Sequence, residues 1–298
     1  MKLVTGVSVV VFWIGASVVL AQEPTPPTTS ETIWRGSRDI YAKLKRDEFP
    51  KIVHADFADD EWPSTYVIRN TPNLRTLVVG GPRCTDDAIL PDIEKAKSLR
   101  TLVLDSTNVT DQGIEQFQER RPDVLVLRSQ RWAIRQLRSL SPELRMDTRF
   151  NEQHPELRQL LGDALLEEVT GFDTYNLPQE AERPVERFTD LQLMPLKYLD
   201  TLTHLNLTWS EITDAGLQYV KECQRLEHLQ LPLGMVSDKA LIQCARQLRK
   251  LKTLRIEFPR YVGYPDAARE RYELLQAKLR RVSVTCYSLD KLDQGEAE

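Results

Sequence analysis

A pattern of leucine and aspartate recurs along this chain every 24 or 25 residues, and no other feature limits its possible folds as strongly. Four units open with LRTLVV, LRTLVL, LTHLNL and LEHLQL, at Leu74, Leu99, Leu202 and Leu226, and LKTLRI follows at Leu251. Ten residues after the first four starts come CTDDAI, VTDQGI, ITDAGL and VSDKAL. One such unit cannot bury its own apolar face, so we expect neighbouring units to stack.

Each unit predicts a short strand followed by a helix. The spacing L-x-x-L-x-L puts Leu205 and Leu207 on one face of a strand. Thr or Ser followed by Asp then predicts an N-cap and a first-turn negative charge, at Thr85/Asp86, Thr110/Asp111, Thr213/Asp214 and Ser237/Asp238. The small residues that follow predict a close approach of helix to strand layer, at Ala88, Gly113, Gly216 and Ala240. Phe188–Leu199 matches the second half of a further unit.

These units resemble leucine-rich repeats, most closely the short T-D-x-G-L type seen in exported bacterial proteins, which is similar to the cysteine-containing repeats of F-box proteins. The resemblance implies an α/β fold, a leucine-rich-repeat solenoid or horseshoe with a parallel concave sheet and convex helices. It also implies one hydrophobic spine shared by Leu102, Leu205 and Leu229. The Asn usual at the ninth position is replaced in this chain, by Pro82, Thr107, Ser210 and Gly234.

The repeats predict the division of the whole chain. Its parts are a signal peptide (1–21), a flexible spacer (22–32), an N-terminal cap (33–73), leucine-rich repeats (74–127), an irregular insertion or degenerate repeat (128–177), further repeats (178–258), and a C-terminal cap and tail (259–298). In the first cap we expect a helix over Ser37–Phe49 and a strand over Trp62–Arg69. In the second we expect a helix from Asp266 and a closing strand over Val282–Cys286.

The N-terminus predicts export. Lys2 precedes an uncharged run, Leu3–Leu20, and small residues lead to Ala21, where we expect cleavage of a secretory signal. The chain would then be periplasmic or secreted. The alternative is an uncleaved membrane anchor, because about 18 apolar residues is at the low end of what spans a bilayer.

Charge and cysteine content exclude some partners and sites. With 40 Lys+Arg against 44 Asp+Glu, the chain gives no general support for binding nucleic acid. Cys84 and Cys244 occupy apolar repeat positions, which predicts buried thiols. Cys223 and Cys286 share no register, although a disulfide stays open in an exported protein.

Polar residues between the strand leucines predict either a ligand-binding concave face or a plain solvated surface. The candidates are Thr101, Asp105, His204, Asn206, Thr208, His228, Gln230, Thr253, Arg255 and Glu257. His204 and His228 hold equivalent positions, so we expect them about 5 Å apart on adjacent strands. Two imidazoles without a third ligand do not form a firm metal site, and we predict neither a metal nor a cofactor.

Two charged clusters need interpretation. Arg128, Arg131, Arg135 and Arg138 recur at helical spacing, and this basic face either binds an acidic chain or pairs with acids such as Glu152, Glu156, Glu167 and Glu168. The cluster His54, Asp56, Asp59, Asp60, Glu61 lacks the spacing of a calcium loop, which favours a solvated loop.

Motifs for common enzyme chemistries are absent from the sequence, including GxxxxGK, HExxH, GxSxG and the Rossmann glycines. We therefore predict a non-catalytic binding or scaffold module for a protein or cell-envelope ligand, with membrane contact only through an uncleaved N-terminus. One alternative is a structural envelope-assembly component that uses the convex helices or residues 128–177. The other is a carbohydrate-active enzyme with two carboxylates across a groove.

Overall fold

The computed structural model describes residues 33–35, 47–57, 65–140, 144–153, 158–160, 162–174, 188–232, 234–257 and 265–286. The predicted signal peptide, the spacer and most of the predicted helix Ser37–Phe49 lie outside these residues. The chain divides into a first unit, residues 1–132 with 156–165, and a second unit, residues 133–155 with 166–298.

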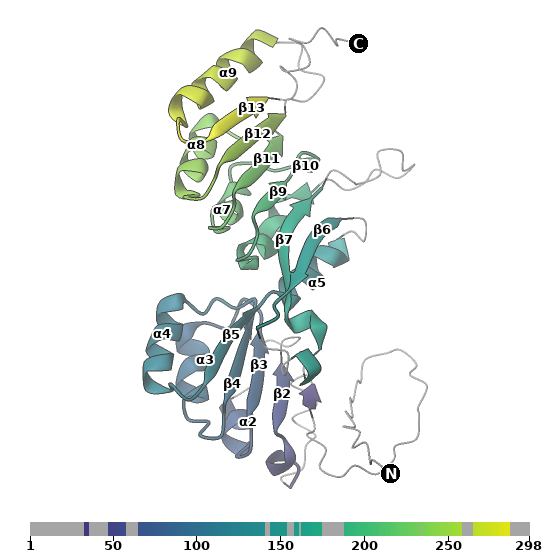
Figure 1. Ribbon diagram of the computed structural model, residues 1–298, viewed down its shortest axis with the longest axis vertical. Helices are drawn as coiled ribbons and strands as arrows, with labels where there is room; N and C mark the ends of the chain where they lie inside the picture. The colour runs from purple at the N-terminus through teal and green to yellow at the C-terminus, as the bar shows by residue number, and fades with distance from the viewer. Residues whose placement is uncertain are drawn as a thin grey trace, which may run out of the picture. The chain divides into compact units, whose positions relative to one another are not determined.

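The first unit contains a parallel sheet with strand order β1-β2-β3-β4-β5 (Figure 1). Its strands are β1 (Ile33–Arg35), β2 (His54–Phe57), β3 (Thr76–Gly80), β4 (Thr101–Asp105) and β5 (Leu125–Ser129). Parallel strands need crossover connections. The connecting helices and turns are η1 (Phe49–Lys51), α2 (Thr65–Asn70), α3 (Asp86–Ile93) and α4 (Asp111–Arg120), and η2 (Asp163–Leu165) also belongs to this unit.

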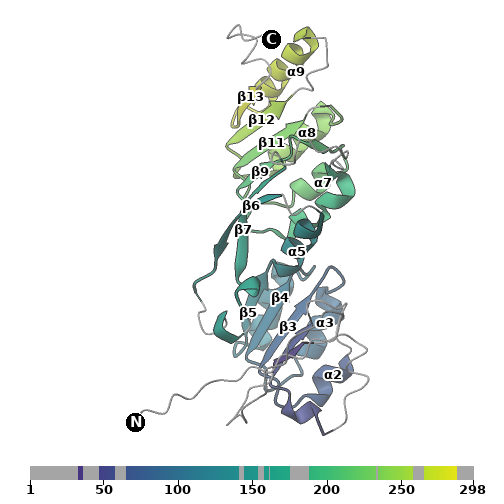
Figure 2. The same ribbon diagram turned by 90° about the vertical axis from the view of Figure 1, so that its right-hand side faces the viewer.

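The second unit contains a sheet with strand order β13-β12-β11-β9-β7-β6. Its strands are β6 (Arg145–Phe150), β7 (Glu167–Asp173), β9 (His204–Asn206), β11 (His228–Pro232), β12 (Thr253–Glu257) and β13 (Ser283–Cys286). A separate two-stranded sheet pairs β8 (Phe188–Thr189) with β10 (Ser210–Glu211). The helical elements are η3 (Asp190–Tyr198), α7 (Leu217–Val220), α8 (Asp238–Gln247) and α9 (Pro265–Lys278). Figure 2 shows α7, α8 and α9 on one face of this sheet.

The sequence predicts one hydrophobic spine and leaves open whether residues 128–177 interrupt the stack; the described residues form two main sheets. Leu102 lies on β4 of the first sheet, whereas Leu205 and Leu229 lie side by side on β9 and β11 of the second. The break follows β5, where the chain forms α5 (Arg131–Leu140) and then β6, which pairs antiparallel with β7. An antiparallel strand reverses the chain direction, so the repeated parallel stacking does not continue through residues 128–177.

Within each sheet the predicted register is confirmed. Leu77 pairs with Leu102, and Leu205 pairs with Leu229, which in turn pairs with Leu254. These leucines are 0–2% exposed, so each repeat receives its apolar cover from its neighbours. Burial of such side chains contributes about 1.5–3 kcal/mol each.

The caps agree with the sequence at one end and differ at the other. The C-terminal helix and closing strand are confirmed as α9 and β13. The strand predicted over Trp62–Arg69 is wrong, because Thr65–Asn70 forms the helix α2. The reason lies upstream: His54–Phe57 is itself a strand, and the residues after it must cross over to reach β3.

The predicted N-caps differ in what their side chains do. Thr110 and Ser237 accept hydrogen bonds from the backbone N–H three residues on, as an N-cap should. Thr85 precedes α3 without such a bond. The helix predicted at Thr213 begins four residues later, at Leu217, although the Thr213 hydroxyl still accepts from the Ala215 N–H at 3.2 Å.

A hydrogen-bonded carboxylate joins each repeat to the next. The Asp of one repeat accepts two hydrogen bonds, from the backbone N–H and the hydroxyl of the Thr or Ser in the following repeat. In Asp86 these bonds measure 2.8 and 2.6 Å. The pairs are Asp86 with Thr110, Asp190 with Thr213, and Asp214 with Ser237. The bonds from Ser237 hold the pKa of Asp214 below its ordinary value.

These carboxylates lie against two of the small residues of the repeat, Gly113 and Gly216. A Cβ atom added to Gly113 would overlap the Asp86 carboxylate, and one added to Gly216 would overlap that of Asp190. The close approach predicted there is therefore to the aspartate of the preceding repeat rather than to the strand layer.

An arginine takes the place of the next cap residue at the end of each series. Arg128 donates to the Asp111 carboxylate at 2.7 Å and to the Val109 carbonyl at 3.0 Å. The equivalent residues in the second unit are Arg271, Asp238 and Val236. Each arginine thus satisfies acceptors that another repeat would otherwise occupy.

Candidate ligand-binding face

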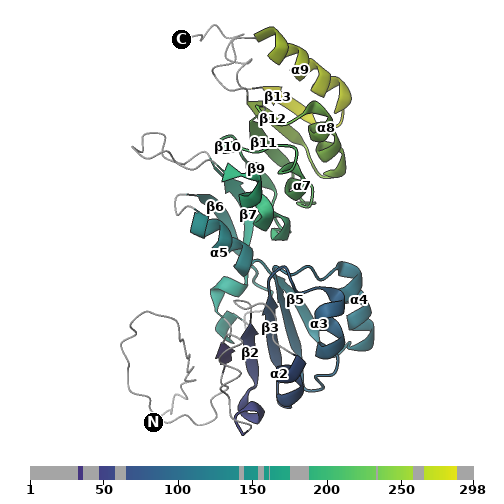
Figure 3. The same cartoon turned by 180° about the vertical axis from the view of Figure 1, so that it is seen from behind.

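The face of the second sheet opposite α7, α8 and α9 is called the open face, and the views from the side and from behind both show it (Figures 2 and 3). Backbone pairing aligns its side chains in rows across β9, β11 and β12. One row is His204, His228 and Thr253, and the next is Asn206, Gln230 and Arg255. Thr208 and Glu257 extend the same face toward the strand ends, and all eight residues are exposed or half-buried.

The two histidines of the open face form a fixed pair. Their rings stack with centroids 4.4 Å apart and planes at 24°, which confirms the predicted separation. The His204 Nδ1 lies 2.8 Å from the Thr203 hydroxyl, and the His228 Nδ1 lies 2.7 Å from the Thr253 hydroxyl. Both ring orientations are therefore set by hydroxyl groups before any ligand is present.

The charge state of this pair depends on its surroundings. Partial burial, followed by repulsion from His204, lowers the pKa of His228, while Glu227 acts in the opposite direction. A stacked pair with one ring neutral presents aromatic faces and ring nitrogens to a ligand rather than two positive charges. Near neutral pH the His228 ring is therefore uncharged, and Arg255 and Glu257 contribute charge to this face.

Asn206 has a structural part as well as an exposed position. Its Oδ1 accepts from the Thr208 backbone N–H at 3.0 Å and from the Thr208 hydroxyl at 2.5 Å. The Thr174 N–H donates to the Asn206 carbonyl at 3.0 Å. The bond from Thr174 joins the residue after β7 to the end of β9, and the bonds from Thr208 occupy the side-chain oxygen of Asn206.

The corresponding face of the first sheet is covered. Val78 and Val103 are 0% and 3% exposed, and they pack against Leu165 and the partly buried Leu160, residues of the segment 156–165. Thr101, predicted to contact ligand, is half-buried beside these residues on β4. The insertion that breaks the sequence repeat thus closes the surface that the first repeats were expected to offer.

Asp105 has a different role from the one predicted. It is 0% exposed, and it accepts hydrogen bonds from Arg131 Nε at 3.1 Å and from the Trp132 backbone N–H at 2.9 Å. Arg131 also donates through both terminal nitrogens to Asp56, at 2.6 and 2.8 Å. Asp56 itself is 6% exposed on β2, so this part of the proposed solvated loop is a buried strand. Asp59–Glu61 lie outside the described residues.

The predicted basic helical stripe forms in part, because Arg131, Arg135 and Arg138 lie on α5. Arg128 lies on β5 rather than on a helix, and it pairs with Asp111. Arg131 is buried between two aspartates. Arg138 pairs with Glu167, one of the expected acids, at 2.6 Å. These three arginines pair with acids, as one of the two interpretations of the cluster predicts.

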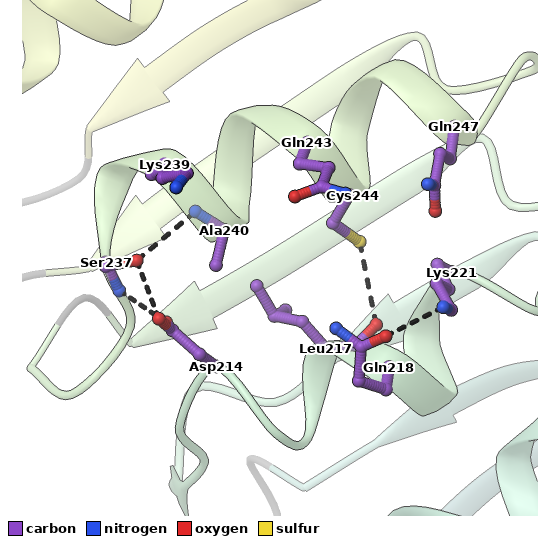
Figure 4. Close-up of a pocket in the computed structure, with 10 residues that line it drawn as sticks. All are labelled: Asp214, Leu217, Gln218, Lys221, Ser237, Lys239, Ala240, Gln243, Cys244 and Gln247. Carbon is purple, nitrogen blue, oxygen red and sulfur yellow. Dashed lines mark hydrogen bonds between the residues drawn. The ribbon is translucent and has the colours of Figure 1, made fainter.

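A shallow groove lies between α7 and α8 on the opposite side of the second sheet (Figure 4). Its volume is about 290 Å³, and polar ends such as Gln218, Lys221 and Gln243 line it. Burial raises the pKa of the Cys244 thiol at its base to about 12, so the thiol stays protonated near neutral pH. The groove therefore supplies no activated nucleophile.

The remaining cysteines are structural as well. Cys84, Cys223, Cys244 and Cys286 are all free and buried, so the disulfide left open by the sequence is not formed. Among the described residues, no three His, Cys, Asp or Glu side chains are grouped to hold a metal ion. In that same part of the chain, every helix is too short or too polar to cross a membrane.

Comparison with known protein families gives a sequence match. A family profile described as "Leucine Rich repeat" matches residues 197–220, which include β9, β10 and α7. This match supports the leucine-rich-repeat interpretation. It covers under a tenth of the chain, and no curated protein matches the sequence.

Among solved structures, a chain from the "Crystal structure of Rad7 and Elc1 complex in yeast" matches at 15% sequence identity with a TM-score of 0.24. The match covers 82% of this chain and 66% of the yeast chain, just under two thirds of its length. A likeness this distant carries no argument about fold or function, and the site stands on its own geometry.

Proposed function

We propose that this chain is a non-catalytic repeat module that recognises a protein or a cell-envelope ligand on the open face of its second sheet. The observation that carries the proposal is the unbroken alignment of polar side chains across β9, β11 and β12. Leucine-rich repeats offer such side chains on the concave side of their sheet, and the profile match at residues 197–220 supports this comparison.

Rigidity supports the same proposal. Binding is weakened by the cost of ordering flexible side chains, about 0.5–1.5 kcal/mol for each one immobilised. The stacked pair of His204 and His228 is already held by two threonine hydroxyls, and the end of β9 is held by Asn206. A ligand that meets this face therefore loses less binding energy to ordering than it would on a mobile loop.

The alternatives lose the features on which they rested. The structural-component alternative relied partly on a basic stripe at 128–138, and three of its arginines are bound to acids within their own unit. The enzyme alternative needs two carboxylates across a groove. The lining of the α7–α8 groove contains one carboxylate, that of Asp214, which accepts two hydrogen bonds from Ser237.

The proposal is tested by affinity capture from an envelope extract with the full chain as bait, followed by mass spectrometry. The test variant is Gln230→Ala with Arg255→Ala, and the matched control is Gln243→Ala with Lys239→Ala on α8. We expect the open-face variant to lose a partner that the control retains. If every captured protein is retained by the open-face variant, the proposed face is wrong.

We also propose that the chain is exported, on the strength of Lys2, the apolar run Leu3–Leu20 and Ala21. N-terminal sequencing of the protein recovered from its producing cells tests this. A mature chain that begins at Gln22 supports cleavage, and an intact Met1 in the cytoplasmic fraction contradicts export.

A further inference from the structure

Basic side chains form a ladder where the chain enters the last three strands of the second sheet. Arg225, Lys250 and Arg280 each lie three residues before the first residue of their strand, β11, β12 and β13. These strands are neighbours in the sheet and pair in register. Adjacent strands are about 4.8 Å apart, so the three cations follow one another along about 10 Å.

Further cations flank this ladder on the helix side. Lys221 and Arg246 lie four residues before Arg225 and Lys250, and both are close to the ends of their helices. Arg249 and Lys278 add two more exposed cations to the same edge. The edge is thus strongly basic in a chain whose formal net charge is −4.

Most of this charge is not neutralised within the part of the chain that the structure describes. The acids nearby in sequence are Glu222, which lies 4.0 Å from Lys221, and Glu227, which pairs with Lys252. Six cations make no ion pair among the described residues: Arg225, Arg246, Arg249, Lys250, Lys278 and Arg280. Like charges held close together repel one another, so the binding of an anionic partner would relieve this repulsion and be favourable.

The first unit shows that the repeat itself does not require this charge. The positions equivalent to the ladder there hold Asn73, Ser98 and Pro122. Several arginines near these positions are neutralised, as in the pairs Arg100–Asp123 and Arg120–Glu94. The ladder is therefore a feature of the second unit alone among the described strands.

We propose that this basic edge docks an acidic protein segment, rich in Asp or Glu. Arginine forks match carboxylates in bidentate geometry, and the spacing of the ladder is close to the 5–6 Å between acidic side chains four residues apart on a helix. The loops 221–227, 246–252 and 278–282 contain no aromatic residue for stacking nucleic-acid bases. Leu226, Leu251 and Leu279 are buried there, so these leucines are not available to insert into a membrane.

This edge is separate from the open face. The ladder lies in the loops that precede the strands, whereas Gln230 and Arg255 lie within them. The two proposals can therefore fail independently, since loss of the ladder leaves the open-face side chains unchanged.

The test is fluorescence anisotropy of the full chain with a labelled helical peptide that carries glutamate at every fourth residue, and with its glutamine counterpart. The ladder variant is Arg225→Glu, Lys250→Glu, Arg280→Glu. The control variant, Lys51→Glu, Arg75→Glu, Lys97→Glu, makes the same charge change at exposed cations of the first unit. Far-UV circular dichroism checks that both fold.

We expect the glutamate peptide to bind, the ladder variant to bind it about ten-fold more weakly, and the control to differ by less than about three-fold. Binding should also fall steeply with salt. A milder variant, Arg225→Gln, Lys250→Gln, Arg280→Gln, should lose less affinity and covers the case in which charge reversal disturbs folding. The proposal is overturned if the glutamate peptide does not bind, or if the ladder variant and the control variant weaken its binding equally. It is also overturned if phosphatidylserine vesicles, heparin or a single-stranded oligonucleotide bind at the ladder in place of the peptide.

Discussion

Substitution of Gly113 by alanine tests the carboxylate link between repeats. The added methyl group would overlap the Asp86 carboxylate, which accepts bonds from the Thr110 N–H at 2.8 Å and the Thr110 hydroxyl at 2.6 Å. The carboxylate is the end of a short side chain and can swing away. Ala240 holds the equivalent position in the second unit, where Asp214 keeps both of its bonds to Ser237 beside a Cβ atom. At Gly113 the added Cβ atom would overlap the Asp86 carboxylate where it now lies, so the carboxylate must shift and its two bonds must weaken.

The net effect follows from two opposing contributions. A hydrogen bond to a charged group contributes about 1.5–3 kcal/mol, and partial exposure of this link lowers that to about 1 kcal/mol for each bond. Loss of both would cost about 2 kcal/mol. Alanine recovers up to about 1 kcal/mol through its higher helix propensity. We therefore expect Gly113→Ala to destabilise the first unit by about 1 kcal/mol, and by no more than about 2 kcal/mol.

Urea unfolding followed by far-UV circular dichroism measures this change, and a double-mutant cycle with Asp86→Ala isolates its cause. Once the carboxylate is absent, Gly113→Ala meets no obstacle and should stabilise the protein. The sign of its effect should therefore reverse between the two backgrounds. If alanine destabilises equally in both, the clash with Asp86 is not the reason for glycine, and the reasoning is refuted.

Two further predictions concern buried and titrating charges. Arg131→Met should destabilise the first unit by about 3–5 kcal/mol in urea unfolding at pH 7, because it leaves the carboxylates of Asp56 and Asp105 buried without their cation; an unchanged midpoint would show that the triad contributes nothing. His228 has a folded-state pKa below its ordinary value of 6.5, so the unfolded chain binds the proton more readily. The contribution of neutral His228 to the free energy of unfolding should be complete above about pH 6.5 and should decline as the pH falls through the folded-state pKa. The substitution His228→Gln should lessen that decline. An NMR titration that places the His228 pKa above that of an unfolded peptide would contradict this sign.

The repeated part of the fold could be predicted from sequence. Spacings of 24 and 25 residues determined which residues pair across strands, and they placed His204 beside His228. Periodicity also identified Leu77, Leu102, Leu205 and Leu229 as core. These results follow because each depends on neighbouring repeats, where one short motif determines both the local structure and the contact.

The parts that could not be predicted depend on contacts distant in sequence. Arg131 pairs with Asp56 across 75 residues, and no spacing rule connects them. Leu165 covers Val103 although it belongs to the segment that breaks the period. Asp105 therefore had the position of a ligand-facing residue but the environment of a buried one. The positions of Arg225, Lys250 and Arg280 can be found in the sequence, since each lies three residues before its strand. That these cations make no ion pair among the described residues could be learned only from the structure.

Site-specific photo-crosslinking tests the recognition face most directly. A photoreactive amino acid replaces Gln230 on the open face in one protein and Gln243 beside the α7–α8 groove in another, and both are irradiated in the same envelope extract. The account predicts a discrete adduct from position 230 and none from position 243. Adducts from position 243 alone would place recognition on the helical side and contradict the central claim.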